Sequence, residues 1–384
     1  MGLQALDDVK GGPRPVLAVA LGAGAARIWG MTGAERLRRM FVRAKLETAT
    51  EAEALAAAPD RGVLLARADW VFDEGLIVAM SKRPGCVLVN GEGQAVAAHV
   101  AGAQMAEAVE ALGDGAPVGL PGVQRLDPGE LAYNSALRKR EPPVLERLTE
   151  SNVRAVEART FKGSYKGVTD LVTKYVWPTP ARIVTRWCAL ARITPNQVTF
   201  VGFLLVLAAF WLFWIGEFGW GLLAGWLMTF LDTVDGKLAR VTMTSSKWGN
   251  VFDHGIDLVH PPFWWWAWFV GVQQATAHPV GWPQIVLGVI LVGYVVQRGL
   301  EGVFMRLFNM HVHAWRPFDS FFRLITARRN PNLILLTLSV LAGRPDIGIV
   351  AVAVWTALSL VVHFVQILQG LATPRGQVVS WMSR

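Results

Sequence analysis

The stretch DTVDGKLARVTMTSSKWGNVFDHGID, residues 232–257, guides the interpretation of the whole chain. Long apolar runs enclose it on both sides. Carboxylates at the edge of a membrane are costly unless they coordinate a ligand. We therefore expect a functional site here, with the rest of the chain delivering substrates to it. The stretch holds four such groups, the carboxylates of Asp232, Asp235, Asp253 and Asp257.

The spacing of these aspartates predicts that they meet. Asp232 and Asp235 are three residues apart, so they lie on one face of a helix. Asp253 and Asp257 are four apart and share a face of the next helix, which a short loop joins to the first. Adjacent carboxylates repel unless cations neutralise them, and all-oxygen ligation suits Mg²⁺, Mn²⁺ or Ca²⁺. We expect two ions, which can clamp a pyrophosphate group.

Small and basic residues in the same stretch suit a ligand that carries phosphate. Gly236 and Gly249 leave room for a ligand to approach the helices closely. Lys237 and Arg240 carry positive charge that can meet the remaining phosphate charge. A set of aspartates could also serve a membrane cation transporter, but these lie together at one membrane face, which favours a metal-dependent reaction.

Composition places the chain among membrane proteins. Of its 384 residues, 53% are hydrophobic and 17% are charged, whereas soluble proteins have about 25% charged residues. The 17 tryptophans suit aromatic belts at two membrane interfaces. The net charge of +8 fits cytoplasmic loops beside anionic lipid, and no nucleic-acid-reading motif is present. Cys86 and Cys188 lie in different regions, which argues against a disulfide framework or a cysteine metal site.

Six apolar segments predict a polytopic α-helical domain of six transmembrane helices. The first follows a helix-start signal, Thr194-Pro195-Asn196. Lys and Arg gather before the first span, after the second and fourth, and in the tail. The positive-inside rule therefore predicts a multi-pass protein of the inner (cell) membrane, with the N-terminal domain, the aspartates and the C-terminus cytoplasmic. The predicted spans are residues 198–215, 220–231, 251–272, 283–296, 331–341 and 347–371.

Residues 1–160 predict a soluble α/β domain that precedes the membrane domain. Apolar runs that alternate with helical patterns are typical of a mostly parallel sheet. The competing interpretation is a signal peptide, because Lys10 and Arg14 precede the first apolar run. The predicted strands are residues 16–21, 62–68 and 85–90, and the predicted helices are residues 35–46 and 104–112.

A basic, aromatic segment separates the two predicted domains. It carries apolar residues at helical spacing around Pro178 and Pro180, which predicts a helix on either side of a proline break. We interpret it as an interfacial amphipathic arm that holds the soluble domain against anionic lipid. The expected division is therefore residues 1–160 for the α/β domain, 161–196 for the arm and 197–384 for the membrane domain.

The pattern D-x2-D-G-x2-A-R-x8-G-x3-D-x3-D resembles the signature of the CDP-alcohol phosphotransferase family. The resemblance covers roughly residues 160–372 and includes the sequence TPNQVT before the first span. The positions that carry the pattern are Asp232, Asp235, Gly236, Ala239, Arg240, Gly249, Asp253 and Asp257.

This resemblance implies a membrane enzyme of phospholipid synthesis that moves a phospho-alcohol group from a CDP-alcohol to a lipid or polyol acceptor and releases CMP. It implies that the four aspartates hold two Mg²⁺ or Mn²⁺ ions. Asp257, with Asp253, would be catalytic, and Asp257 would act as the general base. It also allows a homodimer. The expected CDP-binding residues are Asp232, Gly236, Ala239, Arg240 and Gly249.

The N-terminal domain resembles the nucleotidyltransferase fold. Gly22, Gly24 and Arg27 would form the phosphate loop, Lys45 a further phosphate contact, and Asp69 the acid at a strand end. The glycine-to-arginine spacing is one residue longer than in that fold, and no Pro-Lys pair follows the loop. A domain that binds, regulates or only packs is therefore expected more than an active cytidylyltransferase. If active, it would make the CDP-alcohol within a bifunctional enzyme.

Three further points concern the donor, the histidines near the motif and a basic loop. CDP-diacylglycerol with a soluble acceptor and a soluble CDP-alcohol with a lipid acceptor both fit the motif, and the N-terminal domain favours the soluble donor slightly. His254 and His260 flank the motif and are expected to line it rather than bind metal. A basic loop after the fourth span has a plain interpretation as positive-inside bias and a sharper one as a pocket for phosphate. It contains Arg298, Arg306, His311, His313, Arg316, Arg323, Arg328 and Arg329.

Overall fold

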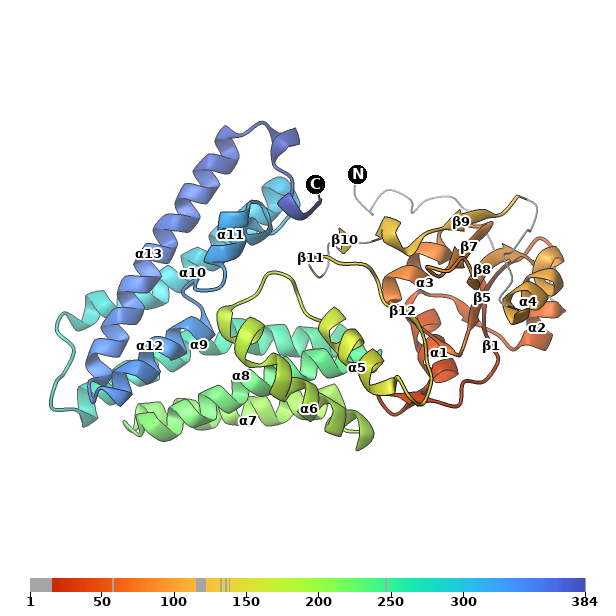
Figure 1. Ribbon diagram of the computed structural model, residues 1–384. Coiled ribbons are helices and arrows are strands. Elements are labelled where there is room, and N and C mark those ends of the chain that lie inside the picture. Colours follow the sequence, from red (N-terminus) through yellow and green to blue (C-terminus); the bar gives the residue numbers. More distant parts are fainter. Residues whose placement is uncertain are drawn as a thin grey trace. The chain divides into compact units, whose positions relative to one another are not determined.

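The computed structural model describes residues 16–56, 59–114, 122–131, 133–134, 137, 139–245 and 247–383 (Figure 1). The chain divides into two compact units. The α/β unit contains the chain up to Ala132 together with Glu141–Gly163, and the helical unit contains Tyr133–Arg140 and the chain from Ser164 onward. Lys10 and Arg14, on which the signal-peptide interpretation rests, lie outside the described residues. The expected boundaries at residues 160 and 196 stay predictions.

A six-stranded mixed sheet forms the centre of the α/β unit. Its strand order is β4-β1-β5-β8-β7-β9. The pairs β4/β1, β1/β5 and β7/β9 are parallel, whereas β8 runs antiparallel to both of its neighbours. The three predicted strands are therefore present, but the sheet is mixed. The strands are β1 (Leu17–Leu21), β4 (Glu47–Thr48), β5 (Gly62–Arg67), β7 (Cys86–Val89), β8 (Ala95–Ala101) and β9 (Gln124–Leu126).

Alternating apolar side chains of this sheet form one core with helix α4. Val19, Leu65 and Val87 are buried in it, because every second residue of a strand points to the same face. The helices and remaining strands of the unit are β2 (Arg27–Ile28), β3 (Met31–Thr32), α1 (Gly33–Arg43), α2 (Glu51–Leu55), β6 (Trp70–Phe72), α3 (Glu74–Ser81), α4 (Met105–Asp114), β12 (Leu145–Arg147) and α5 (Val153–Gly163).

Helices occupy all six ranges that the sequence predicts as spans. Among the described residues, three of them, α7, α10 and α13, are long and apolar enough to cross a membrane. They indicate a membrane-embedded protein, and the six-span topology stays a prediction. The elements of this unit are β10 (Tyr133–Asn134), β11 (Lys139–Arg140), the π-helical turn η3 (Val172–Val176), α6 (Pro178–Leu190), α7 (Pro195–Trp214), α8 (Phe218–Val241), α9 (Lys247–Ala275), α10 (Pro283–Phe308), α11 (Pro317–Phe322), α12 (Arg329–Leu341) and α13 (Pro345–Ala372).

A capping box begins α7, and two contacts pack α9 against α7. Thr194 and Gln197 form a capping box at the start of α7, which confirms the predicted helix start. Gly271 lets α9 approach the end of α7, since a Cβ there would lie 2.0 Å from the Phe213 carbonyl oxygen. Trp264 packs in the core of the helical unit and donates its indole N–H to the Val206 carbonyl at 3.0 Å. The ends of α8 and α9 that carry the aspartates are positioned by this packing.

Candidate functional site

Three of the four aspartates form one carboxylate cluster. Asp232 and Asp235 come from the C-terminal part of α8, and Asp253 comes from the first turns of α9. Each offers an oxygen atom within 4.8 Å of the others. The helical spacing therefore does bring the two helix faces together, as the sequence predicts.

One carboxylate of this cluster is oriented from a third helix. Thr199 on α7 donates its hydroxyl to Asp235 Oδ2 at 2.6 Å. Asp235 is 3% exposed, and its Oδ1 has no hydrogen-bond partner within the described part of the chain. A buried oxygen without a donor is costly. An all-carboxylate set with such an oxygen fits a hard divalent cation.

An arginine joins the fourth aspartate to the cluster. Arg329, the first residue of α12, donates Nη2 to Asp232 Oδ2 at 2.6 Å and Nη1 to Asp257 Oδ1. Its side chain is partly buried and contacts both α8 and α9. The guanidinium offsets part of the repulsion among the carboxylates. The sequence places Arg329 in the basic loop and gives no sign of this bridging position.

The other expected CDP-binding residues lie near the cluster on the same two helices, after Asp235 on α8 and before Asp253 on α9. Arg240 Nη1 contacts the Ser164 carbonyl at 3.4 Å, and its guanidinium lies 3.7 Å from where a Gly236 Cβ would stand. Lys237 also reaches the Ser164 carbonyl, at 3.4 Å. The backbone carbonyl of Ala239 accepts from the Thr244 amide at 3.0 Å. The last member of the set, Gly249, lies in the first turn of α9.

Four arginines and Asp257 line a cavity of about 120 Å³ next to the carboxylate cluster. Arg298 lies in the second half of α10, Arg323 and Arg328 lie between α11 and α12, and Arg329 begins α12; all four belong to the predicted basic loop. Such a concentration of guanidinium groups suits a phosphate or another anion. The lining residues are Asp170, Asp257, Pro261, Tyr294, Arg298, Arg323, Arg328, Arg329, Asn330 and Pro331.

Glu301 holds two of these arginines in place. Arg298 donates to Glu301 Oε1 at 2.7 Å, and Arg328 donates to Oε2. The Nε2 atoms of His313 and His363 each lie 3.3 Å from Oε1. Because both Glu301 oxygens receive guanidinium donors, the group is better explained as a support for the arginines than as a metal centre.

The histidines that flank the motif have different surroundings. His254 is largely exposed, with Nδ1 3.7 Å from Asp253 Oδ2. His260 is buried, with Nδ1 2.6 Å from the Ile256 carbonyl oxygen and its ring against Trp264. Neither residue belongs to the carboxylate cluster.

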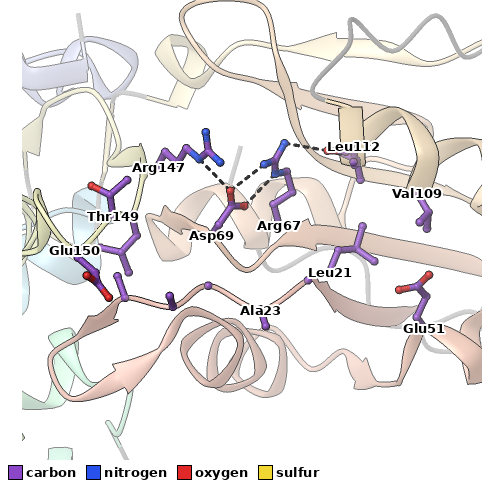
Figure 2. A pocket seen from close by; sticks show the side chains of 16 residues that line it. Leu21, Ala23, Glu51, Arg67, Asp69, Val109, Leu112, Arg147, Thr149 and Glu150 are labelled. Carbon is purple, nitrogen blue, oxygen red and sulfur yellow. Dashed lines mark hydrogen bonds and ion pairs between the residues drawn. The ribbon is translucent and has the colours of Figure 1, made fainter.

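Most of the nucleotide-loop residues predicted in the α/β unit line a second cavity, of about 520 Å³ (Figure 2). Gly22, Gly24 and Asp69 are among its lining residues. Arg27 is not, and its Nη1 donates to the Gly30 carbonyl at 3.2 Å. Lys45 is not a lining residue either.

Comparison with known proteins places a family match on the helical unit. Residues 192–362 match the family model of CDP-alcohol phosphatidyltransferases, and they contain all four aspartates. These residues form a CDP-alcohol phosphatidyltransferase domain. The match begins just before α7 and ends within α13, so it covers the carboxylate cluster and the arginine-lined cavity.

Named relatives match parts of the chain. An archaetidylinositol phosphate synthase of Pyrococcus horikoshii is 40% identical over 81 residues, 20% of this chain and 42% of that protein. A phosphatidylinositol phosphate synthase of Streptomyces avermitilis is 36% identical over 93 residues, 23% of this chain and 38% of that protein. A human ethanolaminephosphotransferase 1 is 36% identical over 98 residues, 21% of this chain and 23% of that protein. The chain thus spans about two fifths or less of the length of these relatives.

Proposed function

We propose that this protein transfers the phospho-alcohol group of a CDP-alcohol to an acceptor hydroxyl, with release of CMP, in phospholipid synthesis. The observation that carries the proposal is the carboxylate cluster of Asp232, Asp235 and Asp253, inside the CDP-alcohol phosphatidyltransferase domain. The synthases and phosphotransferases that the chain resembles support the same class of reaction.

The four aspartates are the proposed ligands of two Mg²⁺ or Mn²⁺ ions. Asp235 supports this assignment best, because Thr199 fixes one of its oxygens and leaves the buried Oδ1 without a partner among the described residues. When bound, the cations supply charge neutralisation at the pyrophosphate of the donor. Arg240, together with Gly236, Ala239 and Gly249, is the proposed seat of the CDP moiety.

Asp257 is the proposed general base. It lies at the boundary between the carboxylate cluster and the arginine-lined cavity, so an acceptor in that cavity has its hydroxyl beside the carboxylate. Asp257 takes the hydroxyl proton as the acceptor oxygen bonds to the phosphorus that carries the alcohol. The bond from that phosphorus to the bridging oxygen breaks, and CMP leaves. Asp253, in the carboxylate cluster, is a proposed metal ligand in the same step.

The arginine-lined cavity supports an acceptor that itself carries a phosphate. Arg298, Arg323 and Arg328 face the cavity, and Glu301 holds two of them. A neutral alcohol offers these guanidinium groups no negative charge, whereas a phosphate accepts several charge-assisted hydrogen bonds. Two of the relatives are named for inositol phosphate products, which agrees with this acceptor class. We therefore favour a phosphorylated polyol as the acceptor and a CDP-lipid as the donor.

The proposed site belongs on the cytoplasmic side of the inner (cell) membrane, with the α/β unit and the C-terminus. The distribution of Lys and Arg supports this orientation.

A matched pair of acceptors tests the proposal. The full chain in lipid nanodiscs with Mg²⁺ receives CDP-diacylglycerol and either inositol phosphate or inositol, and CMP release is measured. We expect release with the phosphorylated acceptor and at least about tenfold less with inositol. A parallel reaction with CDP-ethanolamine and diacylglycerol tests the alternative of a soluble donor with a lipid acceptor. Release only in that reaction would overturn the acceptor assignment, and no release with any pair would overturn the function.

A further inference from the structure

The cavity of the α/β unit lies where two parallel strands end. β1 and β5 are paired in parallel, with Leu21 opposite Arg67 at their carboxyl ends, and both residues line the cavity. Ligands of α/β proteins bind in the crevice outside the carboxyl ends of such strands. The cavity volume of about 520 Å³ lies within the range of small-molecule sites.

The loop after β1, residues 22–26, lines this cavity. Gly22 has a φ of +73°, which turns the chain sharply after the strand. Within the described part of the chain, the amides of Ala23, Gly24 and Ala25 donate to no other group. A side chain at Gly24 would place its Cβ 3.1 Å from the Ala68 carbonyl oxygen. Small residues therefore keep the loop close to the strand end and leave its amides accessible to a ligand.

Asp69 binds two arginines at the opposite wall. Arg67 donates Nε and Nη2 to the two carboxylate oxygens at 3.0 and 2.9 Å, and its Nη1 donates to the Leu112 carbonyl at 3.0 Å. Arg147 donates Nε to Asp69 Oδ2 at 3.1 Å. Figure 2 shows the two guanidinium groups on either side of the Asp69 carboxylate. One negative charge is therefore shared by two positive charges.

The terminal nitrogens of Arg147 remain for a ligand. Its Nη1 and Nη2 donate to no group in the described part of the chain, and its side chain is 65% exposed. Arg67, in contrast, has every nitrogen engaged, so it orients Asp69. The arrangement differs from a metal site, in which the carboxylate oxygens would face the ligand.

The remaining lining adds an apolar wall and no second carboxylate cluster. Val109 of α4 and Leu21 of β1 are partly exposed and give an apolar surface suited to a base or sugar face, above the fully buried Leu112. Glu51 and Glu150 lie at opposite ends of the cavity in Figure 2. Among the described residues, they form no group of acids with Asp69 that could hold a metal ion.

We propose that this cavity binds a nucleoside phosphate without a divalent cation, through the amides of the loop 22–26 and the guanidinium of Arg147, with the nucleoside against Leu21 and Val109. Asp69 acts by fixing the two arginines and is not a metal ligand. The α/β unit is then a nucleotide-binding unit, independent of the reaction proposed for the helical unit.

Calorimetry on the full chain in nanodiscs with EDTA tests this proposal. The probes are CMP, CDP, CTP, AMP, ADP and ATP, with inorganic pyrophosphate as the arm that lacks a nucleoside. Arg147→Ala removes the guanidinium, and Ala23→Asp places a carboxylate on the exposed loop. Arg27→Ala is the matched control, because Arg27 belongs to the same segment but does not line the cavity. Thermal unfolding of each variant confirms that it is folded.

We expect at least one nucleotide to bind in EDTA, more tightly than pyrophosphate. Binding should weaken by about tenfold in Arg147→Ala and by at least as much in Ala23→Asp, and stay unchanged in Arg27→Ala. Equal binding of pyrophosphate would overturn the nucleoside part of the proposal. Absence of binding in EDTA, dependence on Mg²⁺, or wild-type binding by a folded Arg147→Ala variant would overturn the site.

Discussion

The carboxylate cluster of the helical unit and the Asp69 site of the α/β unit both join aspartate to arginine, but in opposite proportions. In the helical unit Asp232 and Asp257 share the single guanidinium of Arg329, and two more aspartates lie beside them. In the α/β unit the single carboxylate of Asp69 receives two guanidinium groups. The first arrangement has negative charge in excess and suits cations. The second has positive charge in excess and suits an anion.

The comparison shows that the ratio of charges decides what a site can bind. Both carboxylate oxygens of Asp69 receive guanidinium donors, whereas Asp232 and Asp257 each give only one oxygen to Arg329. A buried carboxylate oxygen without a donor, such as Asp235 Oδ1, needs a cation or a proton. The same two residue types therefore predict a metal-dependent transferase in one unit and a metal-independent binding site in the other.

The largest expected effect is on the chemistry of the helical unit. Asp257→Asn removes the proposed base and one proposed metal ligand, so CMP release should fall by about 10³-fold. Asp346→Asn is the matched control, since Asp346 pairs with Arg344 at 2.7 Å and lies outside the carboxylate cluster. Initial rates of CMP release from both variants provide the comparison. Loss of activity below tenfold in Asp257→Asn would remove this residue from the mechanism.

Arg329→Gln tests whether negative charge is in excess in the helical unit. Without Arg329 the carboxylates of Asp232 and Asp257 lose their guanidinium partner. This loss should lower the free energy of unfolding by about 3 kcal/mol in EDTA. Mg²⁺ should restore most of that loss, because the ions take over the neutralisation. Thermal unfolding with EDTA and with Mg²⁺ measures both quantities. The same loss under both conditions would mean that the aspartates do not bind the metal.

Glu301→Gln tests the support of the arginine-lined cavity. A neutral amide holds Arg298 and Arg328 less firmly, so the KM for a phosphorylated acceptor should rise by about tenfold while kcat changes little. Glu217→Gln is the matched control, because Glu217 is exposed at the start of α8. Steady-state kinetics would contradict the prediction if kcat fell and KM stayed constant.

The smallest effect concerns the pH dependence of the α/β unit. Burial raises the pKa of Asp69, but the hydrogen bond from Arg67 and the charges of Arg67 and Arg147 outweigh it and leave the pKa below its usual value. Asp69 thus contributes stability above pH 4 that is lost as the pH falls through its lowered pKa. We expect Asp69→Asn to be roughly 1 kcal/mol less stable at pH 7, with the difference shrinking as the pH falls from 4 through the lowered pKa of Asp69. Hydrogen exchange of β5 amides at both pH values measures this, and a difference independent of pH would contradict it.

Local patterns predicted the helical unit well. The aspartate spacing, the helix start at Thr194 and the six apolar runs are each contained within a few turns of helix, and the helices form in those ranges. Side chains at three- and four-residue spacing share a helix face whatever the rest of the fold does. That is why the pairing of α8 and α9 could be anticipated from residues 232–257.

Long-range contacts were not predictable in the same way. No local pattern indicates that β8 runs antiparallel inside the sheet, because the direction of a strand depends on its partners. Arg147 reaches Asp69 from 78 positions away, and Arg329 reaches Asp232 from 97 positions away. In a single sequence these arginines look like ordinary basic residues. Only the fold shows which carboxylates they occupy.

CMP release as a function of Mg²⁺ concentration tests the central claim most directly. The full chain and its Asp253→Asn variant are compared in nanodiscs with CDP-diacylglycerol and a phosphorylated polyol, with EDTA as the zero point. We predict saturable, Mg²⁺-dependent release by the wild-type chain and almost none by the variant. Equal release by both proteins, or release by the wild-type chain that persists in EDTA, would contradict a metal-dependent transfer at the carboxylate cluster.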